Sequence, residues 1–372
     1  MRKTVLFILI LIPILFVGCS HDMNRREIDE INFIHVMGID YQDGEYTVSA
    51  LYSSGGGTDP ESGSGGPGEE ITEGKGTSPY QALEDIRLKN KKTISVANTG
   101  YFLIGEQAAK NGIKECLDFL SRDETIKMEA LIYVVQHSSA LDFLKQGLEN
   151  QQTIHEDLEA VKQKQLELIT RNDNTLVNLL NEMKQNYSSL LIPYLVSEAN
   201  SFLIKGYSVF DQLKLKDYLD LETSSGVNFV KDIVRVYPIY LEDKVGLSLS
   251  YSSTKLSSKL KGNKVKITIK VDFETMIKEV RNQKEVFTRD GLERLTEEQN
   301  EYIRGIIEKA VNYSVTTGLD ILQIARLVEN QHVAKWKELE QGWTKNVSDI
   351  EYEYVVQSKI AKSFILGDEN YK

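Results

Sequence analysis

Residues 265–273 alternate strictly between apolar and polar side chains, and residues 245–251 repeat this pattern. A period of two over this length predicts β-strands that each bury one face. Residues 350–358 predict a further strand on the same grounds. Because these strands surround a block with a helical pattern, they favour an α+β domain with an antiparallel sheet over residues 231–372.

The helical pattern in this part of the chain has recognisable start and stop signals. Thr296 and Gln299 form a capping-box sequence that predicts the start of a long helix, and Gly318 predicts its end. Asp320 is then expected to cap a second helix over residues 321–329. The long helix carries an apolar stripe, so we expect one of its faces to cover the sheet.

Residues 31–150 show strands that alternate with helices, which predicts an α/β domain with a mixed sheet. The predicted extended segments are residues 33–40, 45–52, 69–76, 93–97, 101–104 and 129–135. The predicted helices are one that Ser78 caps, residues 107–121 and residues 138–146. Asp43 and Gly44 predict a tight turn between the first two strands, and the Gly/Ser-rich residues 53–68 predict a flexible loop.

Residues 151–230 predict a smaller middle domain, so three domains are expected in all. Its predicted elements are helices from Thr153 and over residues 174–186, strands over residues 190–196 and 202–210, and a short helix over residues 213–223. Ser224, Ser225 and Gly226 are expected to end this unit.

The N-terminal segment has a pattern of its own. Arg2 and Lys3 precede the almost unbroken apolar run of residues 5–16, and a small residue stands directly before Cys19. This layout predicts a signal peptide over residues 1–18. The run is about half of the roughly 20 residues that a membrane-spanning helix needs, so a transmembrane anchor is the weaker interpretation.

The small residue before Cys19 resembles the end of the lipobox of bacterial lipoproteins, although Phe16 replaces the leucine that is usual there. The resemblance implies that Cys19 receives a diacylglyceryl group and becomes the mature N-terminus. Residues 19–30 would then form a lipid-anchored tether that holds a globular body on the outer face of a membrane. The alternative is an ordinary cleaved signal peptide followed by an incidental cysteine.

The charge of the chain narrows the classes of partner. The formal net charge is −11, and loss of Arg2 and Lys3 with the signal peptide would lower it to −13. A nucleic-acid-binding protein needs a basic face for the phosphates, so this acidic balance argues against that class. It also gives anionic lipid no electrostatic attraction, so we expect the acyl anchor to hold the protein at the membrane.

Sequence patterns for catalysis are incomplete. His155 begins a pattern like that of a zinc-protease helix, but Glu159 stands where the second histidine would be. Lys75 lies in a near-match to a phosphate-binding loop whose flanking residues do not fit. If Cys19 is lipidated, Cys116 has no disulfide partner and is expected to be a small buried thiol.

The histidines and tryptophans also favour a structural interpretation. No histidine has a second ligand at metal spacing among His21, His35, His137, His155 and His332. Trp336 and Trp343 share one face of a predicted helix, and core packing is expected rather than a binding platform. We therefore expect no catalytic residue, no cofactor and no metal, which is the pattern of an interaction subunit.

Several blocks of residues resemble the Ger(x)C lipoproteins, the C subunits of spore germinant receptors, and they follow one another in the order expected for that family. The blocks are residues 26–31, 38–40, 82–84, 103–113, 117–123, 204–210, 218–223 and 318–322, followed by Trp336 and Trp343. The sequence departs from the family at Ser20-His21-Asp22, where Trp-Asp is usual, and at Tyr101, where a histidine is usual.

The resemblance implies a three-domain lipoprotein, α/β and α+β in class, on the outer face of the inner spore membrane. There it would assemble with membrane-embedded A and B subunits into a receptor for nutrient germinants. The family brings no enzymatic activity to this chain, and Cys19 is the one residue to which it assigns a chemical role. The chain is not expected to bind the germinant directly.

Two other function classes remain open from the sequence. A solute-binding lipoprotein of a transporter would have two lobes around a deep ligand cleft. A cell-envelope hydrolase would need an acidic or nucleophilic cluster inside a pocket.

Overall fold

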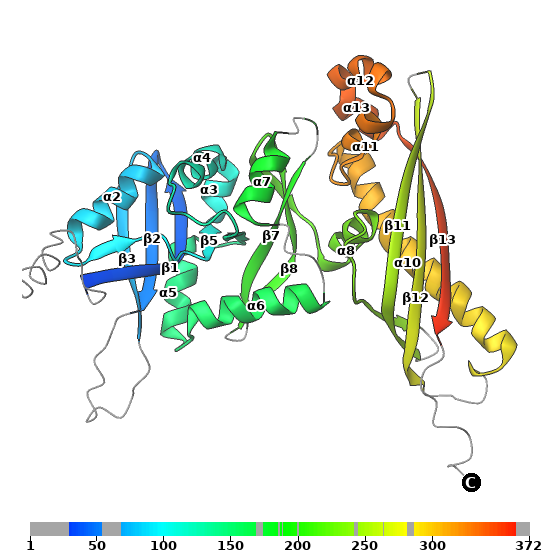
Figure 1. The fold of residues 1–372 in the computed structure, drawn as a ribbon, viewed down its shortest axis with the longest axis horizontal. Helices are drawn as coiled ribbons and strands as arrows, with labels where there is room; N and C mark the ends of the chain where they lie inside the picture. The colour runs from blue at the N-terminus through cyan, green and yellow to red at the C-terminus, as the bar shows by residue number, and fades with distance from the viewer. Residues whose placement is uncertain are drawn as a thin grey trace, which may run out of the picture.

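Two bodies follow each other along the long axis of the molecule in the computed structural model (Figure 1). The structure describes residues 30–53, 68–168, 174–184, 187, 189–198, 201–241, 245–262, 264–280 and 286–361. The expected signal peptide, Cys19 and nearly all of the expected tether lie outside these residues, as do residues 54–67 of the expected loop.

One large mixed sheet forms the N-terminal body. Its strands are β1 (Ile31–Gln42), β2 (Glu45–Ser53), β3 (Glu69–Gly76), β4 (Thr93–Ser95), β5 (Tyr101–Ile104), β6 (Leu131–Val135), β7 (Leu190–Glu198), β8 (Ser201–Asp211) and β9 (Lys214–Tyr218). Within the described residues they pair in the order β3-β2-β1-β5-β6-β7-β8-β9, and β4 pairs with β1. The β1–β5, β5–β6 and β6–β7 pairs are parallel, while β2, β3, β8 and β9 join antiparallel.

This arrangement confirms the predicted mixed sheet, which also takes in the strands that were expected in a middle domain. Asp43 and Gly44 form the predicted turn between β1 and β2, both with positive φ. The division of the chain at residues 150 and 230 stays a prediction, and the sheet runs across the first of these positions.

Helices cover both faces of this sheet (Figure 1). They are α2 (Pro79–Lys89), α3 (Glu106–Asn111), α4 (Lys114–Arg122), α5 (Ala140–Glu149), α6 (Ile154–Leu168) and α7 (Leu176–Met183). Leu83, Leu117 and Leu179 pack into the core on one face, whereas Phe143 and Leu158 pack into the core on the other. All side chains of β5 and β6 are buried, because parallel strands in the middle of such a sandwich are covered twice.

The single helix predicted over residues 107–121 is wrong in one respect, because it is two helices. Gly112 ends α3 with a φ of +131°, a conformation that glycine adopts most readily, and α4 follows after one residue. The apolar spacing continues across this break, so periodicity alone did not reveal it. Cys116 lies on α4 with no solvent exposure, which confirms the buried thiol.

The short helix predicted over residues 213–223 is also wrong. Residues 214–218 form β9, an antiparallel partner of β8, and a helix, α8 (Leu221–Val230), follows. Gln212 and Leu213 make the turn with positive φ, and neither is a residue type typical of such a turn. Asp220 caps α8, so Ser224, Ser225 and Gly226 lie inside a helix instead of ending the unit.

The C-terminal body contains a second sheet with a long helix across one face (Figure 1). Its strands are β10 (Pro238–Leu241), β11 (Val245–Lys261), β12 (Lys264–Val280) and β13 (Glu351–Ala361), in that order. Its helices are α10 (Arg289–Thr317), α11 (Ile324–Gln331), α12 (Val333–Leu339) and α13 (Trp343–Ser348). The expected antiparallel pairing holds for β10, β11 and β12, whereas β13 joins β12 in parallel after the connection through the helices.

The start of α10 corrects the predicted capping box. Thr288 caps the helix by accepting a hydrogen bond from the backbone N–H of Gly291, so Thr296 lies in its second turn. Gln299 is fully buried and does not reach back to a cap. Its Oε1 accepts a hydrogen bond from the Thr275 hydroxyl on β12 at 2.7 Å, which ties the helix to the sheet.

Helix α8 lies between the two sheets and joins the bodies (Figure 1). Gly226 of α8 faces α10 so closely that a Cβ atom there would lie 2.3 Å from the carbonyl oxygen of Ile306. The core around this contact includes Leu191 and Val209 from the large sheet as well as Ile267 from the small one. The two bodies therefore share one apolar core.

We predict that Gly226→Ala lowers the free energy of unfolding by about 1–3 kcal/mol, because α8 and α10 must move apart to admit the methyl group. Gly305→Ala is the matched control, since Gly305 lies within α10 with no atom within 4 Å of its would-be Cβ. The control should gain about 0.5–1 kcal/mol from helix propensity. Urea unfolding of both variants measures the difference, and equal stability would contradict the close contact.

Candidate functional site between the two bodies

Two residues whose sequence patterns raised the question of catalysis or phosphate binding, Cys116 and Lys75, lie in surroundings that give them no such role. Burial raises the pKa of the Cys116 thiol to about 12, so it is not a nucleophile at neutral pH. Gly74 packs against α2 so closely that a Cβ atom would lie 2.3 Å from the carbonyl oxygen of Ala82. The glycines around Lys75 thus permit packing of a helix on β3 and do not form a phosphate loop.

A polar cluster that sequence spacing did not reveal surrounds His155 on α6. The His155 ring stacks on that of His35 from β1, with 4.9 Å between ring centroids. Burial, and then the nearby His155, lower the pKa of His35. Glu159 accepts hydrogen bonds from the hydroxyl of Tyr101 and from Lys162, the latter at 3.0 Å. The two histidines are 120 positions apart, and only the packing of α6 on the sheet brings them together.

These side chains line an open cavity of about 570 Å³. Among the described residues, no group of three or more His, Cys, Asp and Glu side chains is placed to hold a metal ion. Tyr101 and Lys162 bind the Glu159 carboxylate, whereas the buried Nδ1 of His155 has no hydrogen-bond partner among the described residues.

Two buried carboxylates act as helix caps. Asp40, at the end of β1, accepts hydrogen bonds from the backbone N–H groups of Ala140 and Leu141 at 2.7 and 2.9 Å. Burial raises the pKa of Asp40 to about 6, although these two hydrogen bonds oppose the shift. A Cβ atom at Gly105 would overlap the Asp40 carboxylate, so glycine is required there.

The second cap, Asp320, is fully withdrawn from solvent. It accepts hydrogen bonds from the backbone N–H groups of Ile324 and Ala325 at 2.8 and 2.7 Å, in the first turn of α11. The helix begins three residues later than predicted and Gln323 holds its N-cap position, so Asp320 satisfies the helix start from outside that position. The indole N–H of Trp343 donates to the same carboxylate at 3.2 Å. Burial raises the pKa of Asp320. Trp336 and Trp343 are both buried, which confirms the core interpretation.

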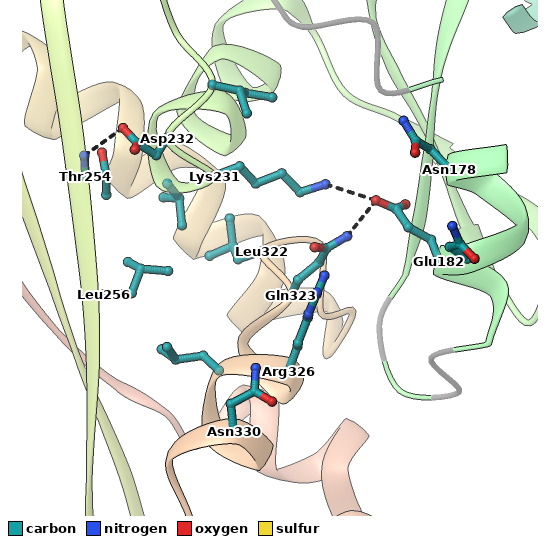
Figure 2. Close-up of a pocket in the computed structure, with 14 residues that line it drawn as sticks. Asn178, Glu182, Lys231, Asp232, Thr254, Leu256, Leu322, Gln323, Arg326 and Asn330 are labelled. Carbon is teal, nitrogen blue, oxygen red and sulfur yellow. Dashed lines mark hydrogen bonds and ion pairs between the residues drawn. The ribbon is translucent and has the colours of Figure 1, made fainter. Parts of the chain in front are cut away.

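A groove of about 730 Å³ lies where α7 of the N-terminal body faces the C-terminal body (Figure 2). Helix α7 contributes three residues to its lining, and the others come from the end of α8 and the residues after it, from β11, and from α11 and the two residues before it. The lining residues are Asn178, Asn181, Glu182, Val230, Lys231, Asp232, Ile233, Thr254, Leu256, Leu322, Gln323, Arg326, Leu327 and Asn330.

Glu182 holds the two walls of this groove together. Its Oε1 accepts a hydrogen bond from the Gln323 amide at 3.0 Å and lies 4.0 Å from the ammonium nitrogen of Lys231 (Figure 2). On the C-terminal side, Asp232 accepts a hydrogen bond from the backbone N–H of Thr254 at 2.9 Å. Amide and charged groups dominate the lining, which suits the binding of a polar group and offers no nucleophile beside a base.

Both domain models of one family match this chain. The model described as the spore germination protein N-terminal domain matches residues 24–197, and the model described as spore germination B3/GerAC like, C-terminal, matches residues 205–363. Together they cover most of the sequence in the order that the family requires.

The chain belongs to the GerAC family of spore germination proteins.

Spore germination proteins of Bacillus subtilis (strain 168) are similar to this chain. Spore germination protein KC is 21% identical over 378 residues, which cover 92% of this chain and 91% of that protein. YfkR, which carries a spore germination name, is 24% identical over 337 residues, which cover 85% of this chain and 82% of that protein. The crystal structure of the GerBC protein matches with a TM-score of 0.58 at 16% identity over 88% of this chain and 97% of that one, and it shows the shared fold.

Family-like blocks that are distant in the sequence meet in this structure. Asp40 lies against Gly105, so the block over residues 38–40 packs on the block over residues 103–113. Tyr218 donates a hydrogen bond to Glu106 at 3.2 Å, which links that block to the one over residues 218–223. In the described part of this GerAC family chain, no helix is long and apolar enough to cross a membrane.

We predict that Glu182→Ala destabilises the protein by about 0.5–1.5 kcal/mol, because it removes the acceptor of the half-buried Gln323 amide and the charge partner of Lys231. A double-mutant cycle with Gln323→Ala should give a coupling energy of about 1 kcal/mol. Glu301→Ala is the control, since its side chain is 73% exposed and should change stability by less than about 0.5 kcal/mol. A coupling energy of zero would mean that the hydrogen bond does not connect the bodies.

Proposed function

We propose that this chain is the non-enzymatic, lipid-anchored C subunit of a spore germinant receptor and is needed for nutrient-triggered germination. The observation that carries the proposal is the match of both GerAC domain models, in order, across residues 24–197 and 205–363. The GerBC-like fold over nearly the whole chain supports the same assignment. In this function the protein assembles with membrane-embedded A and B subunits.

The polar groups inside the protein support a role in interaction rather than in catalysis. Asp40 and Asp320 each use their carboxylate oxygens to cap a helix, and Glu159 is bound by Tyr101 and Lys162. A general acid or base needs a free position for substrate, and these groups are already engaged within the fold. The surfaces of the two bodies are then what the protein offers to its receptor partners.

The anchor supports a location at the outer face of the inner spore membrane. Cys19 is the lipidation site in this proposal, and β1 begins at Ile31. The intervening segment spans at most about 40 Å when extended, since each residue adds about 3.3–3.6 Å. The N-terminal body therefore stays within that distance of the lipid headgroups.

The groove between the bodies is the feature that would favour a solute-binding lipoprotein instead. Solute-binding proteins of two lobes close around their ligand by a hinge. Here Leu191 and Val209 of the large sheet share a core with the C-terminal body, so closure of the groove would disrupt apolar packing. The shared core makes the receptor subunit the better-supported function.

Deletion of the gene for this chain should abolish germination in response to the nutrient that its receptor senses. Spores of the deletion strain should still germinate with a stimulus that bypasses the receptors, because the later steps are intact. Loss of optical density and release of dipicolinic acid measure both responses. Normal germination with every nutrient tested, in a strain without paralogues, would contradict the proposal.

Cys19→Ala should shift the protein from the membrane to the soluble fraction of lysed spores, or leave it unprocessed, and should lower nutrient germination. Cys116→Ala is the matched control, because Cys116 is buried and distant in sequence from the anchor. Immunoblots of spore fractions measure the distribution. Full membrane retention with normal germination would mean that the body docks through its partners without the lipid.

A further inference from the structure

One face of the β11–β12 hairpin carries a ladder of lysines, which we call the lysine face. The pairing places Lys255 opposite Lys270, Lys259 opposite Lys266, and Lys261 opposite Lys264. Residues that pair directly across an antiparallel ladder point to the same face, and residues two positions apart along a strand do so too. All six ammonium groups therefore lie on the face opposite the apolar core.

The lysine face is unusual for this chain. Residues 251–270 contain six lysines and no Asp or Glu, although the chain as a whole carries −11 and its remaining residues therefore carry −17. Like charges directly opposite each other destabilise a sheet, so the three lysine pairs weaken the hairpin that holds them. Such a cost is expected where the positive charge meets an external anion.

Carboxylates of β13 border the lysine face: Glu351 pairs in register with Lys266, and Glu353, which lies opposite Thr268, also attracts Lys259. Lys266 pairs with Glu353 at 3.1 Å and Lys270 with Asp272 at 3.4 Å. The other four lysines form no ion pair with any residue that the structure describes. All four are exposed to solvent: Lys255, Lys259 and Lys261 on β11 and Lys264 on β12.

The side chains of this face indicate which kind of anion it fits. Between the lysine pairs the outward positions are small hydroxyl residues, such as Ser257 opposite Thr268. The energetic centre of a protein interface is enriched in aromatic residues and arginine and depleted in lysine, and this face has the reverse composition. Lysine ammonium groups are mobile point charges, and clusters of four to eight suit the spread charge of anionic lipid headgroups.

We propose that the lysine face docks on anionic lipid headgroups and gives the protein a second membrane contact. It belongs to the C-terminal body, at the other end of the long axis from β1, the strand that follows the proposed tether in the sequence (Figure 1). Two contacts at opposite ends turn the long axis toward the plane of the membrane, which neither contact does alone. The inference rests on the proposed function for the lipid anchor, and the lysines orient the body that the acyl chains hold.

The test uses the full, lipidated chain on vesicles and a fluorophore that brightens in an apolar environment. Ser257→Cys provides a labelling site between two lysine pairs. The label reacts selectively at this position, because Cys116 is buried and Cys19 is acylated. On vesicles of phosphatidylcholine with phosphatidylglycerol, the fluorophore should brighten, and a quencher carried on the lipid should then strongly quench its fluorescence. Phosphatidylcholine alone, or high salt, should reduce the quenching several-fold.

A matched pair of variants separates the lysine face from total charge. Lys255→Gln, Lys259→Gln and Lys261→Gln together should reduce the quenching several-fold and leave the thermal midpoint unchanged or higher. The control combines Lys91→Gln, Lys92→Gln and Lys114→Gln, which are exposed lysines of the N-terminal body, and should keep the signal. Equal quenching on both vesicle types, or equal loss in the two variants, would overturn the proposal.

Two further outcomes have a definite meaning. A signal that arises only when the A and B subunits share the vesicle would replace lipid with an acidic protein partner and overturn the lipid assignment. Flotation with the vesicles is scored separately, so a chain that floats without quenching refutes the lysine face and leaves the anchor intact. A chain that floats with neither vesicle type refutes both the anchor and the lysine face.

Discussion

The apolar core that α8 closes against α10 is the contact on which the arrangement of the two bodies depends. Gly226 lets the two helices approach until backbone touches backbone, and Leu191 and Val209 extend the same core onto the large sheet. A close-packed core of this kind tolerates little relative motion. The positions of the groove, the lysine face and the start of β1 relative to one another follow from this contact.

Hydrogen bonds of polar residues inside the two bodies also hold helices and strands in fixed positions. Asp40 and Asp320 cap helices that begin beside strand ends, and Gln299 ties α10 to β12 and, through Ser358, to β13. These three side chains thereby meet hydrogen-bond partners and avoid the cost of desolvation without one. What remains for binding is on the surface, where the charge is unevenly distributed. A GerAC family protein with an acidic average can thus still offer a strongly basic face to a membrane.

Some elements could be predicted because the burial of one face leaves a local pattern. The alternation over residues 265–273 marks β12 correctly, and the predicted strands and helices of the N-terminal body largely match the structure. The misses have physical causes. Leu213, Leu215 and Leu219 fit a helical period as well as a strand, and only the pairing with β8 decides between them. Gln299 fits a capping box, but in the structure its side-chain amide forms hydrogen bonds with hydroxyl groups on distant strands.

The sequence by itself determined the lipobox-like end of the N-terminal segment, the α/β character followed by α+β, the buried environment of Cys116 and of both tryptophans, and the resemblance to the Ger(x)C family. Tertiary structure alone decided that one sheet spans residues 31–218, that His35 meets His155, and that six lysines within sixteen positions stand opposite one another. The reason is the distance along the sequence between the residues whose contacts decide each feature. Burial of one face repeats every two or 3.6 residues and is visible locally, whereas strand register and helix packing are set by contacts between residues far apart in the chain.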